Sequence, residues 1–166
     1  IQFAYKQELP IIPYGAGSGV CGAVADRPNG LIIDLKRMRK VLSIDQDAQT
    51  VNVQTGILGQ HLEDILEQHG FKLGHSPSSI MTSTVGGYIA ARSAGQFSSK
   101  YGTFDDMLLG AQVHTATRTL QCGMWAQNEH DYLPVISGSE GSLGVISSAL
   151  LRINPLPKHR WLRGFY

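Results

Sequence analysis

The stretch at residues 15–22 (GAGSGVCG) holds four glycines in eight positions and constrains the fold more than any other feature. Its last six residues match G-x-G-x-x-G, the phosphate loop of Rossmann folds, where a following helix supplies the amides that hold a pyrophosphate. Here residues 28–30 (PNG) follow within a few positions and leave no room for a helix of that kind. The sequence therefore excludes a Rossmann site.

Small side chains leave the backbone N–H groups of this loop accessible, and a run of such groups can curl around an anion without a helix. The loop contains no lysine, so the main chain would have to hold the ligand. Hydrogen bonds to a charged acceptor contribute roughly 1.5–3 kcal/mol each, so three or four amides would hold a diphosphate. The alternative is a tight connection between two strands, and the loop alone does not decide between them.

Composition narrows the class of protein. The 166 residues fit one domain, and 16% charged residues with a net charge of +1 disfavour a nucleic-acid partner. No apolar run approaches the roughly 18 residues that span a membrane. Two cysteines, Cys21 and Cys122, indicate a reducing compartment rather than a disulfide scaffold, so we expect a soluble, cytoplasmic protein, with a bridge between them left open.

Hydrophobic periodicity predicts an α+β fold. Helices are expected over residues 57–69, ended by Gly70 in a left-handed conformation, and over 85–93, with the end of another over 1–6. Residues 117–132 give no clear pattern. Strands are expected over residues 8–14, 31–35, 107–115, 133–136 and 143–153, with a hairpin formed by 41–44 and 50–54.

Three further clusters share the character of the glycine loop. Residues 77–87 (PSSIMTSTVGG) precede the second helix, residues 91–95 (ARSAG) follow it, and residues 138–146 (GSEGSLGVI) precede a strand. Each alone reads as a turn. Together these segments, rich in glycine and hydroxyls and poor in charge, fit a long ligand lying against the main chain.

These motifs resemble the FAD-binding domain of the vanillyl-alcohol oxidase and p-cresol methylhydroxylase type. Residues 13–19 look like its P-x-G-G-G-T-S loop, residues 83–87 with 92–95 and 101–102 like its central S-T-V-G-G block, and residues 138–146 like G-S-E-G-T-L-G-V-I. Within the family, the central block is most similar to alkylglycerone-phosphate synthase, followed by glycolate oxidase and D-lactate dehydrogenase flavin subunits.

The resemblance implies two α/β subdomains, one with a small sheet and one with a larger mixed or antiparallel sheet, and FAD between them. It assigns cofactor contacts residue by residue. The pyrophosphate would lie on Pro13, Tyr14, Gly15, Ala16, Gly17, Ser18 and Gly19. The flavin-side pocket would be lined by Ser78, Ser79, Ser83, Thr84, Gly86, Gly87, Ala91, Arg92, Ser93 and Ala94. The site would be closed near the ribityl and adenosine portions by Glu140, Gly141, Ser142, Leu143, Gly144, Val145 and Ile146.

Departures from the family pattern refine this expectation. Tyr14, Ala16 and Gly19 replace other residue types in the first loop, which removes one or two polar contacts. The loop carries no histidine of the kind that covalent relatives use, so dissociable FAD is expected, with His75 as a remote alternative for a covalent link. Relatives also have a cap domain for substrate, so residues 1–166 are expected to be an incomplete FAD-binding domain without an N-terminal strand and the cap.

The expected function is the FAD-binding portion of an oxidoreductase that acts on a 2-hydroxy acid or a related CH–OH donor bound by the cap. The alternatives are an alkylglycerone-phosphate-synthase-like flavoenzyme without net redox turnover, and a non-catalytic flavin-binding accessory subunit. Catalytic residues, substrate, electron acceptor and oligomeric state are not defined by the sequence.

Other chemistries are disfavoured. The six histidines show no metal-ligand spacing, and no serine lies in a G-x-S-x-G elbow. Asp105 and Asp106 are adjacent and are expected to cap or solvate a turn. The basic cluster at residues 158–163 is expected to be a solvated exit from the domain.

Overall fold

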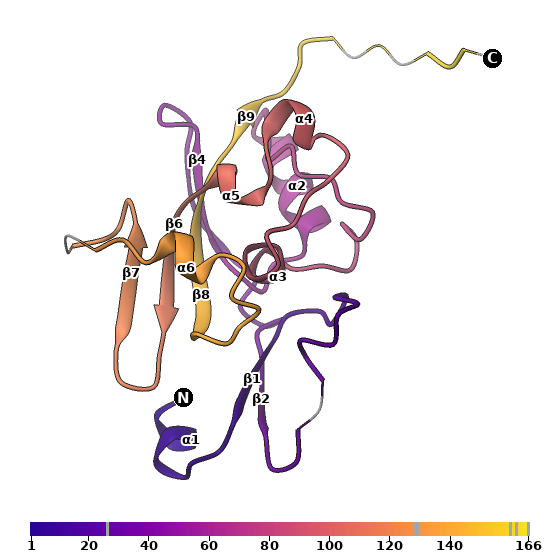
Figure 1. Cartoon of the computed structure of the whole chain (residues 1–166). Helices are drawn as coiled ribbons and strands as arrows, with labels where there is room; N and C mark the ends of the chain where they lie inside the picture. The colour runs from indigo at the N-terminus through magenta and orange to yellow at the C-terminus, as the bar shows by residue number, and fades with distance from the viewer. Residues whose placement is uncertain (26, 128–129, 160, 162, 166) are drawn as a thin grey trace.

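The computed structural model describes residues 1–25, 27–127, 130–159, 161 and 163–165 (Figure 1). The chain begins with helix α1 (Gln2–Lys6) and a small parallel sheet of β1 (Ile11–Tyr14) and β2 (Leu31–Asp34). The glycine loop connects these strands, and residues 15–25 and 27–30 contain no helix, which confirms the prediction that no Rossmann helix follows the loop.

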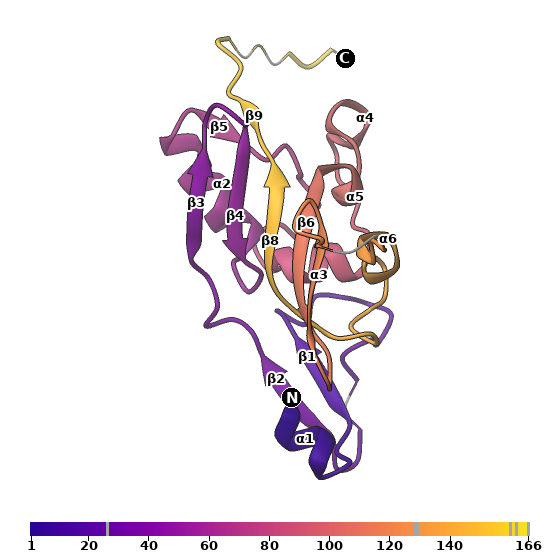
Figure 2. The same ribbon diagram turned by 90° about the vertical axis from the view of Figure 1, so that its left-hand side faces the viewer.

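The largest sheet in the described part of the chain has five strands (Figure 2). All its neighbouring strands are antiparallel. Its order is β3 (Val41–Asp45), β4 (Thr50–Gln54), β8 (Val145–Arg152), β6 (Leu108–His114) and β7 (Thr119–Gly123). The expected combination of a small sheet with a larger antiparallel sheet is confirmed.

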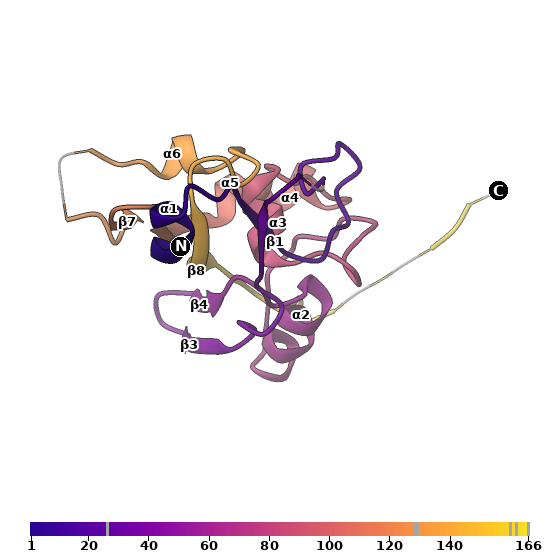
Figure 3. The same cartoon turned by 90° about the horizontal axis from the view of Figure 1, so that it is seen from below.

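Helices α2 (Gly59–Gln68) and α3 (Val85–Ala90) lie on one face of the large sheet (Figures 1 and 3). Alternation along the strands turns Val51, Val53 and other apolar side chains to this face, where they are fully buried against Leu62, Leu66 and Ile89. Gly70 has φ +80° directly after the cap of α2, as predicted. This core therefore fixes α3 and the segment before it against the sheet.

Short elements complete the chain. A two-stranded pair joins β5 (Phe71–Lys72) to β9 (Asn154–Pro155), and single-turn helices form α4 (Ser98–Tyr101) and α5 (Phe104–Met107). In α5, Asp106 Oδ2 accepts the Thr103 backbone N–H at 2.8 Å, so this carboxylate caps a turn as expected. Cys21 is exposed and Cys122 buried, and both are free thiols.

One predicted strand is wrong. Residues 133–136, predicted as a strand, form helix α6 (Leu133–Ile136), since four apolar residues carry no reliable period and Pro134 fits the first helical turn. Part of the unassigned stretch 117–132 forms strand β7, which pairs with β6 from Gly110↔Gly123 to His114↔Thr119. The helix predicted over 85–93 ends at Ala90. The strands predicted over 8–14, 31–35, 107–115 and 143–153 are shorter at their ends in the structure, whereas 50–54 matches β4 and β3 extends one residue beyond 41–44.

Candidate functional site

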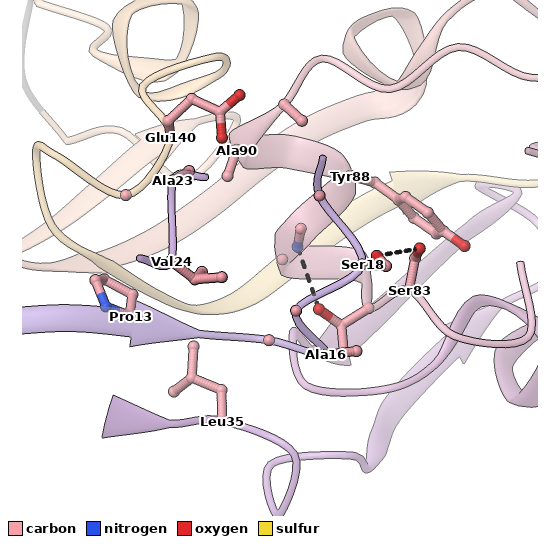
Figure 4. A pocket seen from close by; sticks show the side chains of 18 of the residues that line it. Pro13, Ala16, Ser18, Ala23, Val24, Leu35, Ser83, Tyr88, Ala90 and Glu140 are labelled. Atoms are coloured by element: carbon pink, nitrogen blue, oxygen red, sulfur yellow. Dashed lines mark hydrogen bonds between the residues drawn. The ribbon is translucent and has the colours of Figure 1, made fainter. Parts of the chain in front are cut away.

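A cavity of about 220 Å³ opens where the glycine loop meets the start of α3 and the loop before β8 (Figure 4). Most residues predicted to contact the cofactor line it, although they come from three distant stretches of chain. These are Pro13, Gly15, Ala16, Gly17, Ser18, Gly19, Ser79, Ser83, Thr84, Gly86, Gly87, Ala91, Ser93, Glu140, Gly141, Gly144 and Ile146.

The other predicted residues lie near these segments but do not line the cavity: Tyr14, Ser78, Arg92, Ala94, Ser142, Leu143 and Val145. Five lining residues were missed by the sequence reasoning: Ala23, Val24, Leu35, Tyr88 and Ala90. Their apolar or aromatic side chains carry no pattern that separates a cavity wall from the core, so no signal in the sequence would have identified them.

The glycine loop presents backbone donors that the protein itself does not use. In the described part of the chain, none of the N–H groups of residues 15–19 donates a hydrogen bond to a protein acceptor. Residues 15 and 16 are half-buried and residues 17–19 are exposed, so these donors can pair with water or with a ligand that displaces it. A diphosphate, which is rich in acceptor oxygens, would provide partners for these amides.

The backbone amides at the start of α3, unlike those of residues 15–19, donate hydrogen bonds to protein acceptors. Val85 donates to the carbonyl of Ile57 at 3.0 Å and Gly86 to that of Thr55 at 2.8 Å. Gly87 donates to Thr84 Oγ1 at 3.2 Å, so Thr84 is the N-cap of the helix. These three amides already have partners and are not available to an anion, whereas the amides of residues 15–19 are.

Two contacts hold the loop against the segment before α3. The hydroxyls of Ser18 and Ser83 are 2.6 Å apart (Figure 4). A Cβ built on Gly15 would overlap Thr84 Oγ1. Glycine at position 15 is therefore what allows the loop to approach the helix cap so closely.

Two other glycines leave space along the cavity wall that a side chain could occupy. At Gly19 a Cβ would meet no heavy atom within 4 Å, and at Gly87 it would meet only Thr84 Oγ1, at 3.5 Å. Packing therefore does not require glycine at either position, although both residues line the cavity. Space that a side chain would otherwise fill is thus available to a ligand, and the residues present fit an extended cofactor.

The cavity carries little charge. Of the described residues that line it, Glu140 alone carries a formal charge, and the remainder are glycine, alanine, serine, threonine, proline, other apolar residues and a tyrosine. Neither lysine nor arginine is present among them to pair with a phosphate. Any diphosphate bound here would rely on main-chain and hydroxyl donors.

Two buried rings with polar atoms, Tyr88 in the cavity wall and His75 packed against it, lie next to the site. Tyr88 is 2% exposed, and its hydroxyl has no partner among the described residues. Burial raises the pKa of Tyr88, with a smaller contribution from the charge of Glu63. His75, also 2% exposed, meets Tyr88 edge to face, and burial lowers the pKa of His75 to about 4, so it is neutral at pH 7.

His75 Nε2 lies 3.0 Å from the Ser93 hydroxyl, whereas its Nδ1 has no partner among the described residues. His75 does not itself line the cavity, but Ser93 does.

The described part of the chain contains no group of three or more side chains that would hold a metal ion. It also contains no helix long and apolar enough to cross a membrane. The basic cluster at residues 158–163 lies partly outside the described residues.

The chain belongs to the family of FAD-binding domains, since the model described as "FAD binding domain" matches residues 1–122. Its relatives include alkyldihydroxyacetonephosphate synthases, with 38% identity to the protein of Dictyostelium discoideum and 32% to that of Trypanosoma brucei brucei. Each alignment covers 99% of this chain and 28% of the relative. The glycolate oxidase subunit GlcD of Bacillus subtilis (strain 168) is 31% identical, over 92% of this chain and 33% of the relative.

The fold matches as well. A solved structure of an alkyldihydroxyacetonephosphate synthase superposes with a TM-score of 0.89 and 38% identity, covering 95% of this chain and 29% of that one. The chain therefore spans less than a third of the length of these synthases. The resemblance to FAD-binding flavoproteins drawn from the sequence motifs is confirmed.

Proposed function

We propose that this chain binds FAD in the cavity, with the diphosphate on the amides of residues 15–19. The observation that carries the proposal is that these amides belong to residues lining the cavity and donate to no acceptor in the described part of the protein. Chemical complementarity supports it, because a ligand with anionic oxygens fits unpaired N–H groups in a site without cationic side chains.

The remaining contacts follow from the order of segments around the cavity. Ser79, Ser83, Thr84 and Ser93 would line the flavin side, where hydroxyls can donate to or accept from a polar ring system. Glu140 and Gly141 would close the opposite wall, and a carboxylate there suits sugar hydroxyls better than phosphate. The cofactor would then lie between the β1–β2 unit and the larger sheet. No histidine is among the described residues that line the cavity, and dissociable binding of FAD stays a prediction.

We infer that the whole protein is a flavoenzyme of the alkyldihydroxyacetonephosphate synthase kind. Higher identity to the synthases than to GlcD or the D-lactate dehydrogenases supports this assignment over the 2-hydroxy-acid oxidoreductase expected from the sequence. Bound FAD would supply the capacity to accept and return a hydride. The described residues would position it and exclude water, and substrate groups would come from a cap domain.

A 2-hydroxy-acid dehydrogenase or oxidase is the second candidate, supported by 31% identity to the mitochondrial D-lactate dehydrogenase (cytochrome) of Arabidopsis thaliana. The two candidates separate in one assay on the full-length protein. Flavin absorbance at about 450 nm is followed after adding an acylated dihydroxyacetone phosphate or, separately, D-lactate or glycolate. Bleaching by the acylated phosphate and recovery on adding a fatty alcohol supports the synthase.

Bleaching by D-lactate or glycolate alone, with recovery by an electron acceptor, would overturn the synthase assignment in favour of the oxidoreductase. Bound flavin that none of these compounds reduces would favour the non-catalytic accessory subunit.

A further inference from the structure

Arg92 adopts a backbone conformation that glycine normally fills. It follows Ala91, the C-cap of α3, and its φ is +48°. Residues directly after a helix often take this left-handed conformation, but a side chain with a Cβ is disfavoured there. An arginine at such a position is expected to contribute through its side chain.

The guanidinium group joins α3 to the carbonyl end of α6. Arg92 Nε lies 3.0 Å from the Ser137 carbonyl oxygen, and Nη2 donates to the Pro134 carbonyl at 2.7 Å. The planar fork of an arginine holds two carbonyls in a fixed geometry, whereas the ammonium group of lysine is a compact charge on a flexible stem. The side chain is half exposed and does not line the cavity.

A carboxylate completes this cluster. Asp105 Oδ2 lies 3.1 Å from Arg92 Nε, and Asp105 Oδ1 accepts the Ser137 hydroxyl at 2.5 Å. Ser137 is 5% exposed, so this serine is bound through both its hydroxyl and its carbonyl in a largely buried position. The cluster therefore connects α3, α5 and α6 through Arg92, Asp105 and Ser137.

The segment that leaves this cluster forms a wall of the cavity. Gly138 N–H donates to the Ile89 carbonyl and Glu140 N–H to the Ala90 carbonyl, each at 3.0 Å, so the segment runs along the end of α3. A Cβ on Gly138 would lie 2.8 Å from Arg92 Nε, which shows how closely the arginine packs on it. Glu140, with φ +51°, then lines the cavity.

We propose that Arg92 is a positioning residue for the cofactor site: through Ser137 and Asp105 it holds residues 138–141 against α3 and so sets the place of Glu140 and Gly141 in the cavity wall. This role rests on the proposed function, since it assumes that FAD occupies the cavity. It also explains why an arginine predicted to contact the cofactor lies outside the lining. Arg92 would act on the ligand through residues 138–141 and would not contact it directly.

The test compares Arg92→Gly, Arg92→Lys and Arg118→Ala in the full-length protein. Glycine removes the side chain while suiting the positive φ, so the fold is expected to survive. Arg118, an exposed residue in the β6–β7 turn, is the control for the loss of one positive charge. Each variant is titrated with FAD, its bound flavin is examined by visible circular dichroism, and amide hydrogen exchange of the apoprotein is measured.

Arg92→Gly is expected to raise the Kd for FAD by about tenfold or more, because the charge-assisted bonds to the Pro134 and Ser137 carbonyls that position residues 138–141 are lost. Its flavin circular dichroism should change, and the amides of Gly138 and Glu140 should exchange faster while those of β8 do not. Arg92→Lys should recover part of the affinity, and Arg118→Ala should match the wild type.

Equal FAD affinity and equal exchange at residues 138–140 in wild type and Arg92→Gly would overturn the role of Arg92 and leave the proposed function intact. Loss of protection throughout β8 as well would also overturn it, by showing that Arg92 stabilises the whole domain. A wild-type protein that binds no FAD would overturn the proposed function and this role together.

Discussion

The hydroxyls of Ser18 and Ser83 lie 2.6 Å apart although the residues are 65 positions apart in the chain. Ser83 is 5% exposed, whereas Ser18 lies on the exposed glycine loop. Their contact fastens the loop that offers free amides to the segment that leads into α3. Two walls of the cavity, the glycine loop and the segment before α3, are therefore held together by a hydrogen bond between side chains as well as by close packing of the main chain.

Replacing these serines one at a time and together should show coupling. Ser18→Ala and Ser83→Ala each remove the bond, so the double variant should be less destabilised than the sum of the singles by about 0.5–1.5 kcal/mol. Urea unfolding of the four proteins measures this coupling. Strictly additive changes would show that the contact contributes nothing to holding the loop.

Gly15→Ala should damage both the fold and the site. The new Cβ overlaps Thr84 Oγ1, which also caps α3 by accepting the Gly87 N–H. Displacing this hydroxyl costs about 1 kcal/mol for the lost cap, and the loop must move away from the helix. Thermal melting and FAD titration should both show a loss.

Gly19→Ala is the matched control for thermal melting of Gly15→Ala, because the new Cβ at position 19 meets no heavy atom within 4 Å. Its melting temperature should equal that of the wild type. A Gly15→Ala protein as stable as Gly19→Ala would show that the close approach of the loop to Thr84 is unimportant.

Adjacent glycines of α3 should respond in opposite ways. Gly87→Ala should stabilise the helix by up to about 1 kcal/mol, because its methyl group meets only Thr84 Oγ1, at 3.5 Å. The methyl group would, however, occupy part of the cavity that Gly87 lines. Its unfolding free energy should rise while its FAD affinity falls. Gly86→Ala places a Cβ 3.2 Å from the Thr55 carbonyl oxygen and should lower stability by roughly 1–3 kcal/mol.

Guanidinium unfolding and FAD titration measure the two quantities separately. Unchanged FAD affinity in Gly87→Ala would mean that the cofactor does not occupy the space beside this residue.

His75 should make the stability of the protein depend on pH. Burial lowers the pKa of His75 to about 4 in the folded state, whereas the unfolded value is near 6.5. Below about pH 6.5 the unfolded chain takes up a proton that the folded protein does not, so the full stability is present above that pH. It should fall by roughly 3 kcal/mol as the pH approaches 4.

Urea unfolding at several pH values, compared between wild type and His75→Gln, isolates this contribution. The variant should lose the component of the pH dependence that begins near pH 6.5. Parallel curves for the two proteins would show that His75 is not held neutral by burial.

Long periodic elements and the glycine loop were predictable from the sequence. Helix α2 shows apolar spacing over three turns and a glycine that ends it, and residues 28–30 (PNG) after the glycine loop exclude a following helix. The one-turn helices α4 and α5 were not predicted, since four residues are too few to show a period of 3.6. The same limit produced the wrong strand at residues 133–136.

The segments that line the cavity were predictable where their glycine and hydroxyl residues leave the main chain accessible. Segments rich in glycine and hydroxyl residues are typical of a backbone that approaches a ligand, so the segments around Gly15, Thr84 and Gly141, which line the cavity, could be predicted to lie together. That they bind a cofactor stays a prediction. Tyr88 and Leu35 were missed because an apolar residue looks the same in a cavity wall and in a core. The function of Arg92 was also missed, since a brace between α3 and α6 depends on tertiary contacts that leave no local pattern.

The central claim, that the unpaired amides of residues 15–19 hold the diphosphate of FAD, is tested most directly by titrating the full-length apoprotein with FAD and, separately, with riboflavin. Main-chain binding of the diphosphate predicts saturable uptake of one FAD per chain, with riboflavin, which lacks the diphosphate, bound at least about tenfold more weakly. Equal affinity for the two flavins, or no uptake of FAD, would contradict the account.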